Sequence, residues 1–168
     1  VLGIDIPQSM QGDSLAPILD GGKTLEERKY VFAEHNSHGP DPREHYPQRV
    51  VTDGHWYYIL NVDPAKPQLL PDDLRGVEVW GNYAYDAIIQ AKSTHPFQAW
   101  FLTRFSEPRE AEHLYQLDID PWGVNDLARH ESTQEIVSEL RSVMSEWRSA
   151  TKDIQKSPLE IPEHNNPK

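Results

Sequence analysis

Polar residues able to bind a ligand gather between residues 32 and 60. Four of the chain's eight histidines fall in this stretch, together with an asparagine and an arginine that opens a hydrophobic run. Imidazolium, amide and guanidinium groups donate hydrogen bonds to sulfate, carboxylate or sugar oxygens. The stretch therefore predicts contact with an anionic or hydroxylated ligand through His35, Asn36, His38 and Arg49.

The same residues have less specific interpretations, which the sequence leaves open. The histidines can instead hydrogen-bond the backbone of a polar loop. Arg49 can form an ion pair with Glu34 or Glu44 rather than bind a ligand. Two histidines three residues apart, with His45 or Glu44 as a third ligand, are also a weak pattern for zinc.

The rest of the sequence lacks the parts of an independent catalytic centre. The chain has no cysteine, so it can have no disulfide, thiolate metal site or cysteine nucleophile. It also has no G-x-S-x-G, P-loop or Rossmann glycine pattern. The carboxylate-rich stretch LDIDPWGVND, residues 117–126, lacks the glycine and glutamate of an EF-hand loop. It predicts a turn stabilised by Asp side chains.

Composition limits the classes of partner. The 168 residues include 16 basic and 27 acidic side chains, which give a formal net charge of -11. This charge disfavours nucleic acid and anionic membranes. No apolar run in the sequence approaches the length of a membrane span. The length suits one domain, or a small domain with extensions, and an oligomer is possible.

Four strands are expected, three of them around the candidate site. KYVFAEH, residues 29–35, is typical of a buried strand. QRVVT and HWYYIL, residues 48–52 and 55–60, flank Asp53-Gly54, which predicts a hairpin with a type I′ turn. HLYQLDI, residues 113–119, alternates apolar and polar side chains and predicts a further strand, and the turn that follows should seat Trp122 and Leu127.

Helices are expected in three places. A short one follows Asp13 or Ser14, and a second lies within residues 79–92. The strongest pattern predicts a helix over residues 133–150, with Ser132 and Glu135 as a capping box. Its apolar stripe contains Ile136, Val137, Leu140, Val143, Met144 and Trp147, and its opposite face contains Glu139, Arg141, Glu146 and Arg148.

These elements define an α+β fold class. We expect a small antiparallel sheet of about four strands packed against the C-terminal amphipathic helix. Residues 1–30 form a lead-in segment, residues 31–152 form the packed unit, and residues 153–168 form a surface tail that is rich in Pro, Asn and charge.

Several stretches, in this order, resemble one family, the type I sulfatases of the alkaline phosphatase superfamily. GIDIPQSMQGDSLAPIL resembles the segment that closes their catalytic domain. RKYVFAEHNSH is similar to the next strand and loop, and YPQRVVTDGHWYYILN to the following hairpin. EHLYQLDIDPWGVNDLA resembles a later E-E-L-Y-D-L signature. Within the family, the chain looks most like heparan N-sulfatases, the N-sulfoglucosamine sulfohydrolases.

The resemblance implies an enzyme that hydrolyses sulfate esters or sulfamates, with N-sulfated glucosamine in heparan-type glycans as the implied substrate. Its formylglycine nucleophile and Ca²⁺ ion lie upstream in the family, so we expect neither within this chain. The chain then corresponds to a C-terminal subdomain, inactive alone, whose partners are a sulfated saccharide and an N-terminal catalytic domain. By resemblance, the location is periplasmic, secreted or lysosomal. His35, Asn36 and His38 match the family's H-N-x-H loop, and Arg49 matches a hairpin arginine.

The chain also departs from the family. Val51 and Tyr58 lie at or near the places of a second arginine and a lysine, which reduces positive charge around the hairpin. Two alternatives to the proposed specificity follow. The parent enzyme can be a sulfatase or phosphoesterase of other specificity, or the chain can be a free-standing carbohydrate-binding or interaction module without catalysis.

Overall fold

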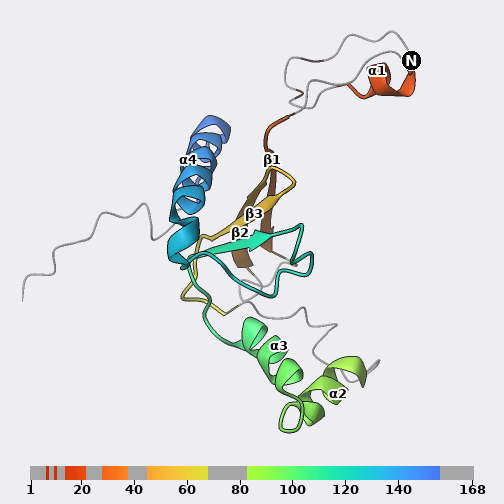
Figure 1. Ribbon diagram of the computed structural model, residues 1–168, viewed down its shortest axis with the longest axis vertical. Coiled ribbons are helices and arrows are strands. Elements are labelled where there is room, and N and C mark those ends of the chain that lie inside the picture. Colours follow the sequence, from red (N-terminus) through yellow and green to blue (C-terminus); the bar gives the residue numbers. More distant parts are fainter. Residues whose placement is uncertain are drawn as a thin grey trace, which may run out of the picture.

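The computed structural model describes residues 7, 10, 14–21, 28–37, 45–67 and 83–155. Its centre is a four-stranded antiparallel sheet in the order β1-β2-β3-β4, crossed on one face by the long helix α4 (Figure 1). The expected α+β fold class is confirmed. The strands are β1 Val31–Ser37, β2 His45–Thr52, β3 Trp56–Asn61 and β4 Glu112–Gln116.

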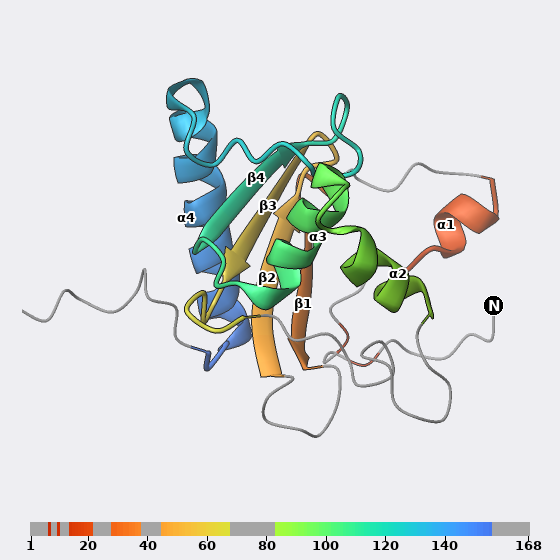
Figure 2. The same ribbon diagram turned by 90° about the horizontal axis from the view of Figure 1, so that it is seen from below.

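Two more helices lie on the side of the sheet opposite α4 (Figure 2). Helix α2, Tyr83–Ala91, falls within the helix expected at residues 79–92. Helix α3, Pro96–Ser106, has no counterpart among the predicted helices. Its apolar residues are spread around the helix rather than along one stripe, so periodicity gave no signal for it. The helices are α1 Ala16–Leu19, α2 Tyr83–Ala91, α3 Pro96–Ser106 and α4 Gln134–Thr151.

The hairpin between β2 and β3 is present, but its turn differs from the predicted type. Thr52 pairs with Tyr57, and only Gly54 has a positive φ, of 90°, whereas a type I′ turn needs two such residues. The Asp53 carboxylate instead accepts hydrogen bonds from the backbone N–H groups of His55 and Trp56, at 2.9 and 2.7 Å. The side chain thus stabilises a longer turn.

The hydrophobic core lies between the sheet and α4. Strand residues that alternate toward the helix meet the apolar stripe predicted for it, and Phe32 of β1 stacks on Trp147 with ring centroids 5.0 Å apart. Burial of this stripe stabilises the helix against the sheet. The fully buried members of the core are Val51, Tyr58, Leu60, Leu114, Ala128, Val137, Leu140 and Met144.

The start of α4 does not use the predicted capping box. A short 3-10 helix, Glu131–Thr133, precedes it, and Thr133 is the N-cap without a side-chain cap hydrogen bond. The Thr133 hydroxyl donates to the backbone carbonyls of Leu127 and His130 instead. These bonds tie the Thr133 side chain to the incoming chain, and it caps none of the N–H groups at the start of α4.

The turn after β4 corrects two expectations. The strand ends at Gln116, so Ile119 is 74% exposed rather than part of an alternating strand face. Trp122 is 87% exposed and is not seated in the turn, whereas Leu127 packs against the core. The expected Asp-stabilised turn is confirmed, because the Asp120 carboxylate accepts from the N–H groups of Val124 and Asn125.

Candidate functional site

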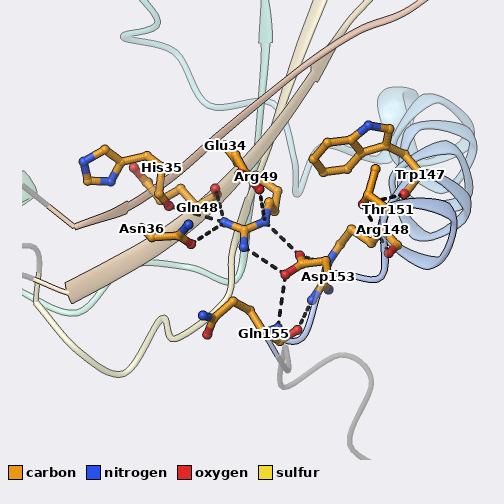
Figure 3. A network of polar contacts seen from close by, with 10 residues as sticks. All are labelled: Glu34, His35, Asn36, Gln48, Arg49, Trp147, Arg148, Thr151, Asp153 and Gln155. Atoms are coloured by element: carbon orange, nitrogen blue, oxygen red, sulfur yellow. Dashed lines mark hydrogen bonds and ion pairs between the residues drawn. The ribbon is translucent and has the colours of Figure 1, made fainter. Parts of the chain in front are cut away.

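The end of β1 and β2 is organised around the buried side chain of Arg49 (Figure 3). Arg49 alternates toward α4 along β2 and is 1% exposed. A guanidinium group has no acceptor and needs several partners when it leaves water. All three of its nitrogens donate hydrogen bonds to protein oxygens.

The main partner of Arg49 is Asp153, just beyond α4. Nε and Nη2 of Arg49 donate to the two carboxylate oxygens at 2.8 and 3.0 Å, in the paired geometry that suits a guanidinium. Arg148 of α4 donates through Nε to the same carboxylate at 2.7 Å. One aspartate therefore joins the inner strand β2 to the end of the long helix.

The two arginine partners of Asp153 stabilise the ionised form of its carboxyl group. Burial of its side chain favours the protonated form, but the hydrogen bonds from Arg49 and Arg148 outweigh that effect. Together they hold the pKa of the Asp153 carboxyl well below its usual range. Because Asp153 is only 6% exposed, solvent screens these pairs weakly. Asp153, the first residue of the expected tail, is thus bonded to both the sheet and the helix.

The third nitrogen of Arg49 faces β1. Its Nη1 donates to the Asn36 amide oxygen at 3.0 Å and to the His35 backbone carbonyl at 3.3 Å. The strand pairing shifts register between His35 and Ser37, so this part of β1 lacks a regular ladder. The guanidinium therefore fixes both residues where the strand is least regular. Asn36 is exposed, and the bond to its oxygen leaves its NH₂ group oriented away from Arg49.

The structure separates the roles of the predicted site residues. Arg49 forms ion pairs within the protein, because its buried guanidinium donates to protein oxygens. Its Nε lies 3.8 Å from the Glu34 carboxylate and closer to that of Asp153. His35 and Asn36 are adjacent at the end of β1; His35 is partly exposed and Asn36 is exposed. His38 lies outside the described residues, so direct ligand contact by His35, Asn36 and His38 stays a prediction.

Sequence reasoning missed the contribution of the C-terminal end of α4. Arg148 was expected on the exposed face, but it is 4% exposed. It lies four residues after Met144 and next to Trp147, so helical geometry places it at the end of the buried stripe. That spacing was the sequence signal for the burial of Arg148. No sequence signal indicated that Asp153 would be its partner.

The residues that the structure describes give no support to the zinc alternative. Within the described residues, no three His, Asp or Glu side chains lie close enough together to hold a metal ion. Glu44, one of the suggested zinc ligands, lies outside those residues. Calcium and formylglycine, which the family resemblance places upstream of this chain, stay predictions. The same part of the chain contains no helix long and apolar enough to span a membrane.

A curated relative is similar along nearly the whole chain. The ulvan-active sulfatase of Formosa agariphila is 27% identical over 154 residues, which are 92% of this chain and 27% of the relative. The chain therefore spans about a quarter of that relative's length. No protein-family model matches the chain.

Solved structures share the fold over 90% of the chain. A candidate sulfatase from Bacteroides thetaiotaomicron VPI-5482 matches with a TM-score of 0.55 and 22% identity, and a 2-O GAG sulfatase with 0.56 and 20%. A protein solved in complex with its substrate D-glucosamine-2-N,6-O-disulfate matches with 0.53 and 16%. This chain covers 22% of each of them.

The fold therefore defines a class: a small antiparallel sheet with a helix packed on it, shared with solved structures of sulfatases. Within that class, the chain is similar to the corresponding part of the ulvan-active sulfatase. The expected likeness to sulfatases is supported at this level, whereas the closer likeness to heparan N-sulfatases stays a prediction.

Proposed function

We propose that this chain acts as the C-terminal subdomain of a sulfatase that removes sulfate from a saccharide. The observation that carries the proposal is the 154-residue similarity to the ulvan-active sulfatase, which covers 92% of the chain. The shared fold supports it independently. In this proposal, the bond-breaking groups belong to the catalytic domain, and this subdomain supplies contacts to the sugar.

Asn36 is the described residue best suited to such a contact. Its amide oxygen is already bonded to Arg49, while its NH₂ group remains a donor on an exposed strand end. A fixed donor fits a sulfate oxygen or a sugar hydroxyl. Arg49, Asp153 and Arg148 act as positioning residues, because they determine the orientation of that amide without reaching the ligand.

The substrate to test first is N-sulfated glucosamine. One protein of the same fold was solved with D-glucosamine-2-N,6-O-disulfate as its substrate, and this compound presents both an N-sulfate and an O-sulfate. The similarity to an ulvan-active sulfatase makes ulvan oligosaccharides the natural competitor. Sulfate release from each, measured with the full-length enzyme, discriminates the two specificities.

Asn36→Asp tests the role of the subdomain. The substitution keeps an acceptor for Arg49 but replaces the donor with a negative charge, so we expect KM for the sulfated saccharide to rise by about tenfold or more. The matched control is Asn125→Asp, which makes the same charge change in the exposed turn after β4. If Asn36→Asp and the control have the same kinetics as the parent enzyme, Asn36 has no contact with the sugar.

A further inference from the structure

The face of the sheet opposite α4 carries a second polar group, which we name the arginine–tyrosine cluster: Tyr46, Arg104, Arg109 and Tyr115. Tyr46 and Tyr115 are both 2% exposed. Arg104 of α3 donates through Nη2 to the Tyr115 hydroxyl at 2.8 Å. Arg109 donates through Nε to the Arg104 carbonyl at 2.7 Å, and its guanidinium lies 5.8 Å from the centre of the Tyr46 ring.

The cluster concentrates positive charge in an acidic protein. The net charge of the chain is -11, yet two guanidinium groups lie within electrostatic range of each other here, with the carboxylates of Asp63 and Asp126 in range of Tyr46 and Tyr115 respectively. Burial lowers the pKa of Arg109, and the charge of Arg104 lowers it further. Within the described ranges, Arg104 forms no ion pair with a carboxylate; its side chain contacts the Trp100 ring and the Tyr115 hydroxyl.

The cluster also presents donors in excess of acceptors. The buried Tyr46 hydroxyl has no hydrogen-bond partner. Nε and Nη1 of Arg104 have no partner among the residues that the structure describes, and Arg104 itself is half-buried. A buried hydroxyl without a partner costs free energy, and a guanidinium without a carboxylate partner attracts an anion. Both observations indicate a ligand that supplies oxygen acceptors and negative charge.

We propose that the arginine–tyrosine cluster binds an oxyanion, a sulfate or carboxylate group carried by a sugar. The sugar ring would lie against the aromatic side chains at the start of α3. Phe97 is 62% exposed and lies 5.3 Å from Trp100, whose ring contacts Arg104, so an apolar surface adjoins the cationic group. The site is separate from Asn36, which lies on the α4 side of the sheet, and it does not depend on the proposed enzyme activity.

The test is a titration of the 168-residue chain, followed through the Arg Nε–H and Trp indole N–H signals in nuclear magnetic resonance spectra. The probes are inorganic sulfate, glucosamine 6-sulfate, glucuronic acid and uncharged N-acetylglucosamine. We expect saturable shifts of Arg104 and Trp100 with the charged sugars, and weaker binding of inorganic sulfate. Comparison of glucosamine 6-sulfate with glucuronic acid identifies which oxyanion the site prefers.

Three variants make the result decisive. Arg104→Gln should weaken binding by about tenfold or more, since it removes a charge-assisted bond. Arg129→Gln, at a side chain that is 77% exposed, should not change it. Tyr46→Phe should fold normally and bind less tightly, because it removes only the unpartnered hydroxyl.

The absence of a saturable shift with any charged probe would overturn the proposal, and so would undiminished binding by Arg104→Gln. Shifts that Arg129→Gln abolishes equally would also overturn it, since they would reflect general attraction of anions. Equal binding of sulfate and the charged sugars would support the oxyanion site, but it would show that the sugar ring gains nothing from the aromatic side chains at the start of α3. An unchanged titration in Asn36→Asp is expected, and it separates this inference from the proposed function.

Discussion

Asp153→Asn should strongly destabilise the protein. The substitution leaves Arg49 and Arg148, which are 1% and 4% exposed, without the carboxylate that pairs with both. Removing one partner from a buried ion pair costs about 3–5 kcal/mol, since a charge then stays buried without compensation. Asparagine retains one acceptor, so we expect the lower end, about 3 kcal/mol of unfolding free energy. For a unit of this size, that loss corresponds to a fall in Tm of roughly 10 °C.

The pH dependence gives the same prediction an independent check. The pKa of Asp153 is lowered in the folded protein, so its carboxylate contributes stability above the unfolded pKa of about 3.9. That contribution is lost as the pH falls below this value toward the folded pKa. The asparagine variant has no proton to gain at this position. The difference in unfolding free energy between the parent and the variant should therefore narrow as the pH falls from about 5 to about 2.

Urea unfolding, followed by tryptophan fluorescence at several pH values, measures both effects. Asp118→Asn is the matched control, because Asp118 is 53% exposed and pairs with His55 at the surface. Such a pair is worth at most about 1 kcal/mol. A loss below about 1 kcal/mol for Asp153→Asn, or parallel pH curves for the parent and the variant, would refute the assigned buried ionic network.

Two further substitutions probe the core and the turn after β4. Leu114→Ala should cost about 3 kcal/mol in urea unfolding, since Leu114 is fully buried between the sheet and α4, whereas Ile154→Ala, at an 87% exposed side chain, should change little; equal effects would contradict the assigned core. Gly123→Ala should cost about 1 kcal/mol because Gly123 has a φ of 59°, although the nearest atoms of Tyr115 leave room for a Cβ at 3.6 Å. Gly123→Asn, a residue that tolerates this conformation, should lose less in thermal unfolding, and a larger loss would point to packing instead of backbone strain.

The periodic elements were predictable because their signals are local. The alternation of β2 and β3 and the apolar stripe of α4 each follow from which side of the element faces the core. The turns were less predictable. Asp53 was expected to adopt a positive φ, but its carboxylate forms hydrogen bonds with two nearby N–H groups and supports a different turn. Several turn conformations satisfy the same polar groups, and one sequence does not decide between them.

The candidate site likewise has features that local sequence predicts and features that it does not. The sequence alone determined which chemical groups are available near the end of β1, an amide and histidines beside an arginine, and it determined the amphipathic character of the elements that carry them. Only the tertiary structure decided that Arg49 faces inward and meets Asp153, which is 104 residues later. The physical reason is that a guanidinium pairs with whichever carboxylate the folded chain brings within reach. Its partner is a property of long-range packing, which local sequence does not encode.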